Sequence, residues 1–163
     1  MLKSPLAPAA LSGAGTSPLI PQGAGGSIEL VTNGNFTSSA GWTLGIGWAI
    51  SGGRALSDGT GSQGDLIARP LDLPITAPRT IRWSVSLGSN GEDPAASAGS
   101  LIVIADDDIG TNAETVVDLA GQPSGTYSGT YTIGVDHGAT PYVGFGYRTI
   151  QCYIDNLSIT VQG

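Results

Sequence analysis

The chain has 163 residues; 40% of them are hydrophobic, only 12% are charged, and glycine supplies 26 beside ten prolines. Because Gly and Pro are the poorest helix formers, this composition excludes a mainly helical protein. The low charge also argues against ordinary disorder. Thirteen acids against six bases give a net charge of −7. No basic stripe is available for nucleic acid or an anionic membrane, and no apolar run reaches the roughly 20 residues of a membrane span.

The first 27 residues differ in composition from the remainder, and we interpret residues 1–27 as an extended arm. Four prolines interrupt any strand or helix period, and Lys3 is the only charged side chain. The same prolines break any apolar run that could serve as a secretory signal. The arm carries five large aliphatic side chains: Leu2, Leu6, Leu11, Leu19 and Ile20. Since proline stiffening lowers the entropy cost of binding, the sequence favours an arm that docks on another polypeptide, with a free leader as the alternative.

Residues 28–163 alternate short apolar runs with turn residues, which predicts an all-β domain of nine or ten strands. The alternation is clearest over 79–87, where every second residue, Trp83 among them, is predicted to face the core. The other two tryptophans, Trp42 and Trp48, are also expected to be buried. The run 100–105 is apolar throughout, as is typical of a strand covered on both faces. Segments 42–44 and 48–50 are predicted to pair as a hairpin around their glycines, and Gly52–Gly53 to form a second turn.

Few residues have the side chains that catalysis needs. His137 is the only histidine and follows Asp136 in a predicted turn, so we expect a solvated loop residue. The run Asp106–Asp108 is interpreted as a solvated turn at a strand end, with cation binding as the alternative. Cys152 is the single cysteine and is expected to be a buried structural thiol. The chain is therefore predicted not to be an enzyme.

Both ends of the 28–163 domain resemble a known family. Residues 29–53, ELVTNGNFTSSAGWTLGIGWAISGG, resemble the first three strands of the galactose-binding-like jelly roll found in carbohydrate-binding modules. Residues 153–161, YIDNLSITV, resemble its final strand. Domains with this sequence motif are familiar from virion proteins of tailed bacteriophages. The resemblance implies a jelly-roll β-sandwich over 28–163, preceded by the extended arm.

The resemblance implies a non-enzymatic virion structural protein displayed on the surface of a tailed-phage particle. Capsid decoration is favoured over a tail or fibre component. The arm would bind other virion subunits, and the protein would act as a homo-oligomer or in multiple copies. The alternative is a carbohydrate-binding module that recognises host-surface polysaccharide, because one fold hosts many functions.

Two kinds of ligand site follow from these expectations. Arg82, Tyr142 and Arg148 fall off the main apolar phase of their strands and are candidates for one glycan-binding sheet face, with a plain polar surface as the alternative. The family often holds a structural Ca²⁺, and Asp155 matches the position of a carboxylate that serves it. Apart from that calcium, no cofactor is expected.

Overall fold

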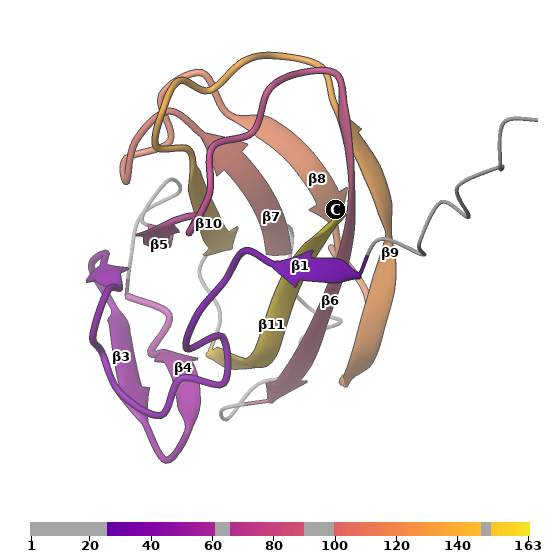
Figure 1. Cartoon of the computed structure of the whole chain (residues 1–163). Helices are drawn as coiled ribbons and strands as arrows, with labels where there is room; N and C mark the ends of the chain where they lie inside the picture. Colours follow the sequence, from indigo (N-terminus) through magenta and orange to yellow (C-terminus); the bar gives the residue numbers. More distant parts are fainter. Residues whose placement is uncertain (1–25, 61–65, 90–99, 148–150) are drawn as a thin grey trace, which may run out of the picture.

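The computed structural model describes residues 26–60, 66–89, 100–147 and 151–163, which form two antiparallel sheets packed as a jelly-roll β-sandwich (Figure 1). Within these ranges the chain forms eleven strands and no helix, and so none long and apolar enough to cross a membrane. The all-β class and the jelly-roll sandwich predicted from the sequence are confirmed. The sequence predicted nine or ten strands, and the described ranges contain eleven.

Six strands form the sheet that we call sheet A, in the order β3-β4-β11-β6-β9 with β1 paired to β11. Their bounds are β1 (Ser27–Glu29), β3 (Trp48–Ser51), β4 (Arg54–Ser57), β6 (Arg79–Ser89), β9 (Gly125–Ile133) and β11 (Cys152–Gln162). Sheet B has the order β2-β5-β10-β7-β8. Its strands are β2 (Thr43–Leu44), β5 (Leu66–Pro70), β7 (Ser100–Ala105), β8 (Glu114–Asp118) and β10 (Tyr142–Tyr147).

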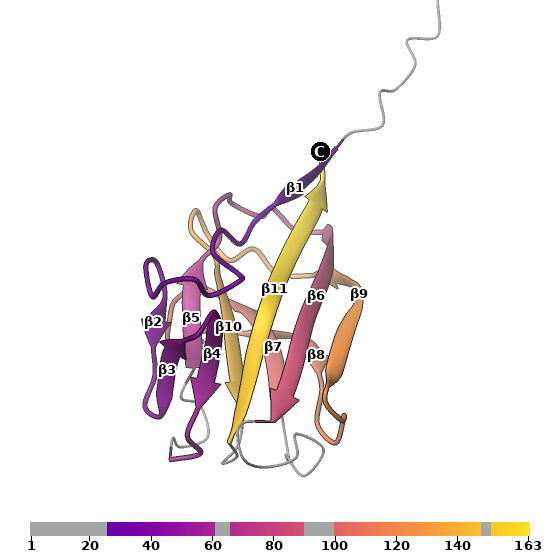
Figure 2. The same ribbon diagram turned by 90° about the horizontal axis from the view of Figure 1, so that it is seen from below.

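The two ends of the described chain lie side by side. Strand β1 pairs antiparallel with the end of β11, with Ser27 opposite Gln162, and the Gly163 amide donates to the Gly26 carbonyl at 3.2 Å. Figure 2 shows both ends at one edge of the sandwich. The sandwich therefore includes Ser27. The five aliphatic residues predicted to dock the arm lie outside the described residues, and their role stays a prediction.

The core lies between the sheets and follows the period-two pattern of the strands. In β6 the inward side chains Ile81, Trp83, Val85 and Leu87 are all buried, which confirms the predicted alternation. Strand β7 is the next to last in sheet B, and Ile102, Val103, Ile104 and Ala105 are all at most 6% exposed. The expectation of a strand covered on both faces is confirmed for these four residues.

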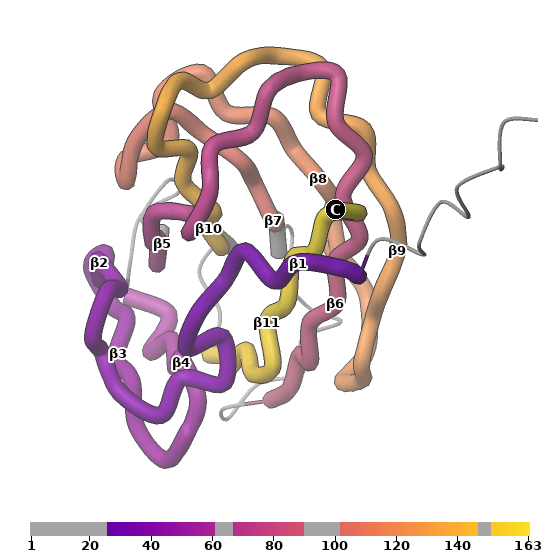
Figure 3. Tube along the Cα trace, in the orientation of Figure 1, coloured from indigo at the N-terminus to yellow at the C-terminus, as the bar shows by residue number. Residues whose placement is uncertain are grey.

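The hairpin predicted around Gly45–Gly47 is wrong. Thr43 and Leu44 pair with β5 in sheet B, whereas β3 pairs with β4 in sheet A. Residues 45–47 instead carry the chain from sheet B to sheet A, along the stretch of trace between β2 and β3 in Figure 3. Gly47 has a φ of 80°. A glycine-rich turn is compatible with a hairpin and with a crossing between the sheets, so the local sequence does not distinguish the two connections. The turn at Gly52–Gly53 is confirmed, with φ of 60° and 74° at the two glycines.

Candidate functional site

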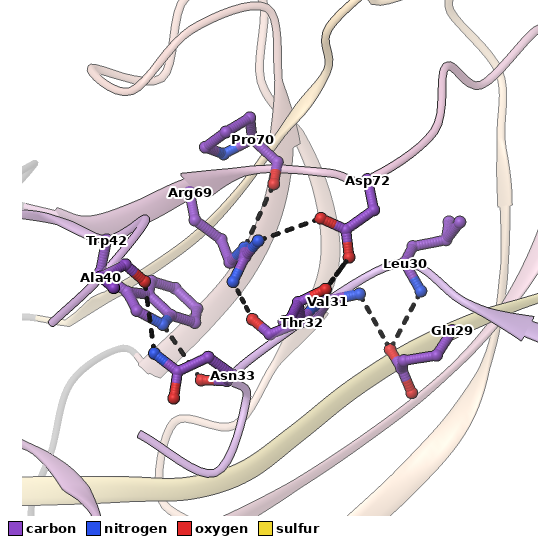
Figure 4. Close-up of polar contacts among 10 residues, drawn as sticks. All are labelled: Glu29, Leu30, Val31, Thr32, Asn33, Ala40, Trp42, Arg69, Pro70 and Asp72. Atoms are coloured by element: carbon purple, nitrogen blue, oxygen red, sulfur yellow. Dashed lines mark hydrogen bonds and ion pairs between the residues drawn. The ribbon is translucent and has the colours of Figure 1, made fainter. Parts of the chain in front are cut away.

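Glu29 fixes the first strand onto the last. Its Oε1 accepts hydrogen bonds from the amides of Leu30 at 3.1 Å, Val31 at 3.0 Å and Ile159 at 2.9 Å, while Oε2 accepts one from the Ser158 hydroxyl. Figure 4 shows the first two of these bonds. The carboxylate is therefore occupied by protein donors. Its function in this arrangement is structural.

Arg69 forms a second polar cluster beside it, in which each nitrogen of the guanidinium makes a hydrogen bond (Figure 4). Nη2 lies 3.0 Å from Asp72 Oδ1, Nη1 donates to the Thr32 carbonyl, and Nε donates to the Pro70 carbonyl at 3.2 Å. The same group lies 5.6 Å from the centre of the Trp42 ring. Only 7% of Arg69 is exposed. It joins β5 to the loop after β1, and each of its three nitrogens has a protein partner.

The expected calcium finds little support at Asp155. This residue is half-buried on sheet A, and its Oδ1 accepts the Asn156 amide at 2.7 Å. Across the described ranges, no group of three or more His, Cys, Asp or Glu side chains could hold a metal ion. Calcium prefers six to eight oxygens, and the nearby Glu29 carboxylate is already filled. These residues do not fit a calcium site, and a role of Asp155 in holding the ion stays an expectation of the resemblance.

The prediction that His137 is a solvated loop residue is wrong, because only 2% of it is exposed. Its Nδ1 lies 2.9 Å from Asp106 Oδ1, and its Nε2 lies 3.4 Å from Glu114 Oε1. The neighbouring Asp136 does not contact the ring in this arrangement; it accepts the Ala77 amide at 2.6 Å. The segment after β9 folds over the ends of β7 and β8, so the acids that matter are distant in sequence. The imidazole side chain is fully buried and therefore cannot reach a substrate.

Glu114 is held ionised by the same cluster. Burial raises its pKa, but hydrogen bonds from the Gly134 amide, the Tyr131 hydroxyl and the Val135 amide lower it more, together with the charge of His137. The net pKa lies below the ordinary value of 4.5. These contacts link sheet B to sheet A through the Tyr131 hydroxyl at 2.9 Å. The cluster is a structural bridge.

Aromatic side chains of the described residues mostly face the core. Trp42, Trp48 and Trp83 are 7%, 7% and 8% exposed, as predicted. Tyr142 is half-buried and shares the outer face of sheet B with the glycines of β10. One row across this outer face is built only from small side chains: Thr43, Ala68, Gly144, Val103 and Thr115. Ala68, Gly144 and Val103 in this row are buried, so the centre of the row offers no open surface to a sugar.

The outer face of sheet A is different, because Ser and Thr alternate along its strands. In 126–132, TYSGTYT, each Ser or Thr is exposed, and the Tyr and Gly residues between them are half-buried. A hollow of about 200 Å³ lies on this face around Arg82. Its lining comes from four strands: Ser27, Thr80, Arg82, Thr130, Thr160, Val161 and Gln162. This "Arg82 hollow" is the candidate functional site.

The structure separates the three predicted glycan residues. Arg82 lies on sheet A and Tyr142 on sheet B, while Arg148 is outside the described residues. They therefore do not gather on one described face. Arg82 was predicted from the sequence, but its hydroxyl neighbours on β9 and β11 were not. The Ser/Thr alternation over 126–132 was the available signal for them.

Comparisons with known proteins bear on the fold. No family model matches the chain, and no curated protein matches its sequence. Solved structures do match. The C-terminal family 22 carbohydrate-binding module of Clostridium thermocellum Xyn10B is 20% identical, with a TM-score of 0.55 over 88% of this chain and 98% of that one. The CBM22-1 xylan-binding domain of Paenibacillus barcinonensis Xyn10C is 15% identical, with a TM-score of 0.56 over 86% and 97%.

Other matches show how widely this sandwich is used. The K3 cleaved adhesin domain of Lys-gingipain from Porphyromonas gingivalis W83 is 17% identical, with a TM-score of 0.53 over 83% of this chain and 99% of that one. The chain spans only 28% of the CBM22-1–GH10 modules of Clostridium thermocellum endo-1,4-β-D-xylanase 10B, at 16% identity and a TM-score of 0.55. At such identities the likeness shows the jelly-roll fold alone.

Proposed function

We propose that the chain is a non-catalytic carbohydrate-binding module that recognises a cell-surface polysaccharide. The observation that carries this proposal is the Arg82 hollow, a concave group of hydroxyls and one guanidinium on an open sheet face. Sugar hydroxyls pair with such donors and acceptors. The neighbours whose names describe xylan-binding modules share the sandwich over more than four fifths of this chain, which supports the same function without establishing it.

The carboxylates argue for binding rather than hydrolysis. A glycosidase needs two carboxyl groups on either side of the scissile bond, about 5–9.5 Å apart. None of the residues that line the Arg82 hollow is acidic. Near the buried histidine, Asp106 is paired with His137, and the oxygens of Glu114 accept hydrogen bonds from two backbone amides and the Tyr131 hydroxyl. The geometry of the described residues therefore favours recognition of a glycan that stays intact.

Display on a virion, as capsid decoration or as a tail component, is a separate hypothesis. It rests on the sequence resemblance and on the arm residues, such as Leu19 and Ile20, that lie outside the described ranges. Nothing in the described structure or in the comparisons favours it over the glycan-binding function. A displayed jelly roll could carry out both roles.

Affinity electrophoresis of the full chain in gels that contain xylan, soluble cellulose derivatives or acidic polysaccharides tests the proposal. We expect at least one polysaccharide to retard the protein, with a dissociation constant in about the millimolar to micromolar range. The heat-unfolded chain in the same gels is the control for nonspecific retardation. If no polysaccharide retards the folded chain, the proposal is wrong.

A further inference from the structure

The Arg82 hollow is built from a single cross-strand row and its neighbours. Glu29 of β1 stands opposite Thr160 of β11, Thr160 opposite Arg82 of β6, and Arg82 opposite Thr130 of β9. Cross-strand neighbours on one face lie about 4.5–5.5 Å apart. Arg82 therefore stands between Thr130 and Thr160 on this row, and Ser27, Thr80 and Gln162 complete the polar lining.

Arg82 is the one arginine of the described ranges whose guanidinium has no partner. Arg54 lies over the Tyr153 ring at 4.2 Å, and Arg69 is paired with Asp72 at 3.0 Å. Arg79 donates to the Gln162 carbonyl. By contrast, Arg82 is exposed and makes no hydrogen bond, ion pair or ring contact. Its five N–H donors are available to a ligand.

The chemistry of the lining favours an anion. The polar side chains are one guanidinium, four hydroxyls and one amide, and no carboxylate competes for the arginine. Glu29 is on the same row, but its carboxylate is engaged by backbone amides and Ser158. The chain as a whole has a net charge of −7, so an arginine without an acidic partner stands out on its surface. A guanidinium binds a carboxylate or sulfate through two parallel hydrogen bonds.

From these observations we infer that the Arg82 hollow binds an acidic sugar residue of the glycan. Arg82 would take the carboxylate or sulfate group, and the Thr130 and Thr160 hydroxyls would bind hydroxyls of the same ring. The volume of about 200 Å³ lies below the roughly 300–1,000 Å³ of sites for drug-sized molecules, so it suits one sugar residue. This inference rests on the proposed glycan-binding function and names its ligand class.

Calorimetric titration of the full chain with oligogalacturonate tests the inference, with the methyl-esterified oligomer as the uncharged counterpart. We expect the free acid to bind and Arg82→Gln to weaken it at least about tenfold, as loss of a charge-assisted hydrogen-bond pair implies. Esterification should weaken binding similarly, and Arg54→Gln, on the same sheet, should leave it unchanged. Thr130→Val removes one hydroxyl and should weaken binding while Arg82 is intact. Titrations with dextran sulfate and with uncharged dextran test in the same way whether a sulfate group is bound.

Each other outcome has a defined meaning. If a neutral polysaccharide binds and Arg82→Gln does not alter it, the acidic-sugar inference is overturned while the glycan-binding function stands. If no acidic or neutral glycan binds, both fail. If inorganic sulfate binds as tightly as the acidic sugars, the hollow is a simple anion site and the inference is again wrong. Circular dichroism of Arg82→Gln should match that of the parent chain, because the side chain is exposed.

Discussion

The imidazole Nδ1 of His137 lies 2.9 Å from Asp106 Oδ1, although the two residues are 31 positions apart in the chain. Asp106 directly follows β7, and on the other side of the ring Glu114 begins β8. The single histidine thus joins two neighbouring strand ends of sheet B to the segment that leaves β9. Its burial between two acids indicates a contribution to stability.

Replacing His137 by alanine should destabilise the fold by about 2–3 kcal/mol, because the change removes the hydrogen bond between its Nδ1 and the Asp106 carboxylate and leaves a cavity where a buried ring packed. Urea unfolding followed by tryptophan fluorescence measures the loss. Gln122→Ala, at an exposed turn position, is the control and should change the free energy of unfolding by no more than about 0.5 kcal/mol. Equal stability of both variants would contradict the structural role.

Glu114 should make stability depend on pH in the acid range. Its pKa in the folded state lies below the ordinary value of 4.5, so the folded state favours the ionised form. The stability that it contributes is complete above the unfolded pKa and is lost as the pH falls through the folded pKa. In Glu114→Gln this part of the acid dependence should disappear. Thermal unfolding between about pH 3 and 7 checks it, and an unchanged slope in the variant would refute the assignment.

Gly34 should tolerate no side chain. A Cβ at this position would lie 1.8 Å from the carbonyl oxygen of Leu157, whose amide also donates to the Gly34 carbonyl at 2.9 Å. Backbone cannot move aside at low cost, so Gly34→Ala should destabilise by about 3 kcal/mol or more. Gly26→Ala is the matched control, because nothing lies within 4 Å of its Cβ. Denaturant midpoints of the two variants should therefore differ clearly; similar midpoints would show that the loop relaxes.

Cys152 should be unreactive in the folded chain. It is fully buried, and this desolvation raises the pKa of its thiol to about 12, so almost no thiolate is present at neutral pH. Labelling with a thiol-specific disulfide reagent at pH 8 should give no native reaction and one thiol per chain after unfolding in guanidinium. Rapid labelling of the native chain would contradict this and show that the start of β11 opens.

The strands of the sandwich could be predicted from the sequence because the patterns that indicate strands and turns are local. Alternation in β6 and the glycine pair after β3 follow from side-chain period and turn geometry, and both were confirmed. The crossing at Gly45–Gly47 depended on which sheet each strand joins, which no local pattern records. The same holds for His137, whose partners Asp106 and Glu114 become neighbours only after β7 and β8 pair. Arg82 was identified, but the threonines around it belong to three different strands.

The central claim is that the outer face of sheet A binds the glycan at Arg82. Nuclear magnetic resonance titration of the full chain with oligogalacturonate tests it most directly. We expect the largest amide shifts at Arg82, Thr130 and Thr160, with small changes at Ala68 and Gly144 on the opposite sheet. Shifts concentrated on β5 and β10, or none at saturating ligand, would contradict the claim.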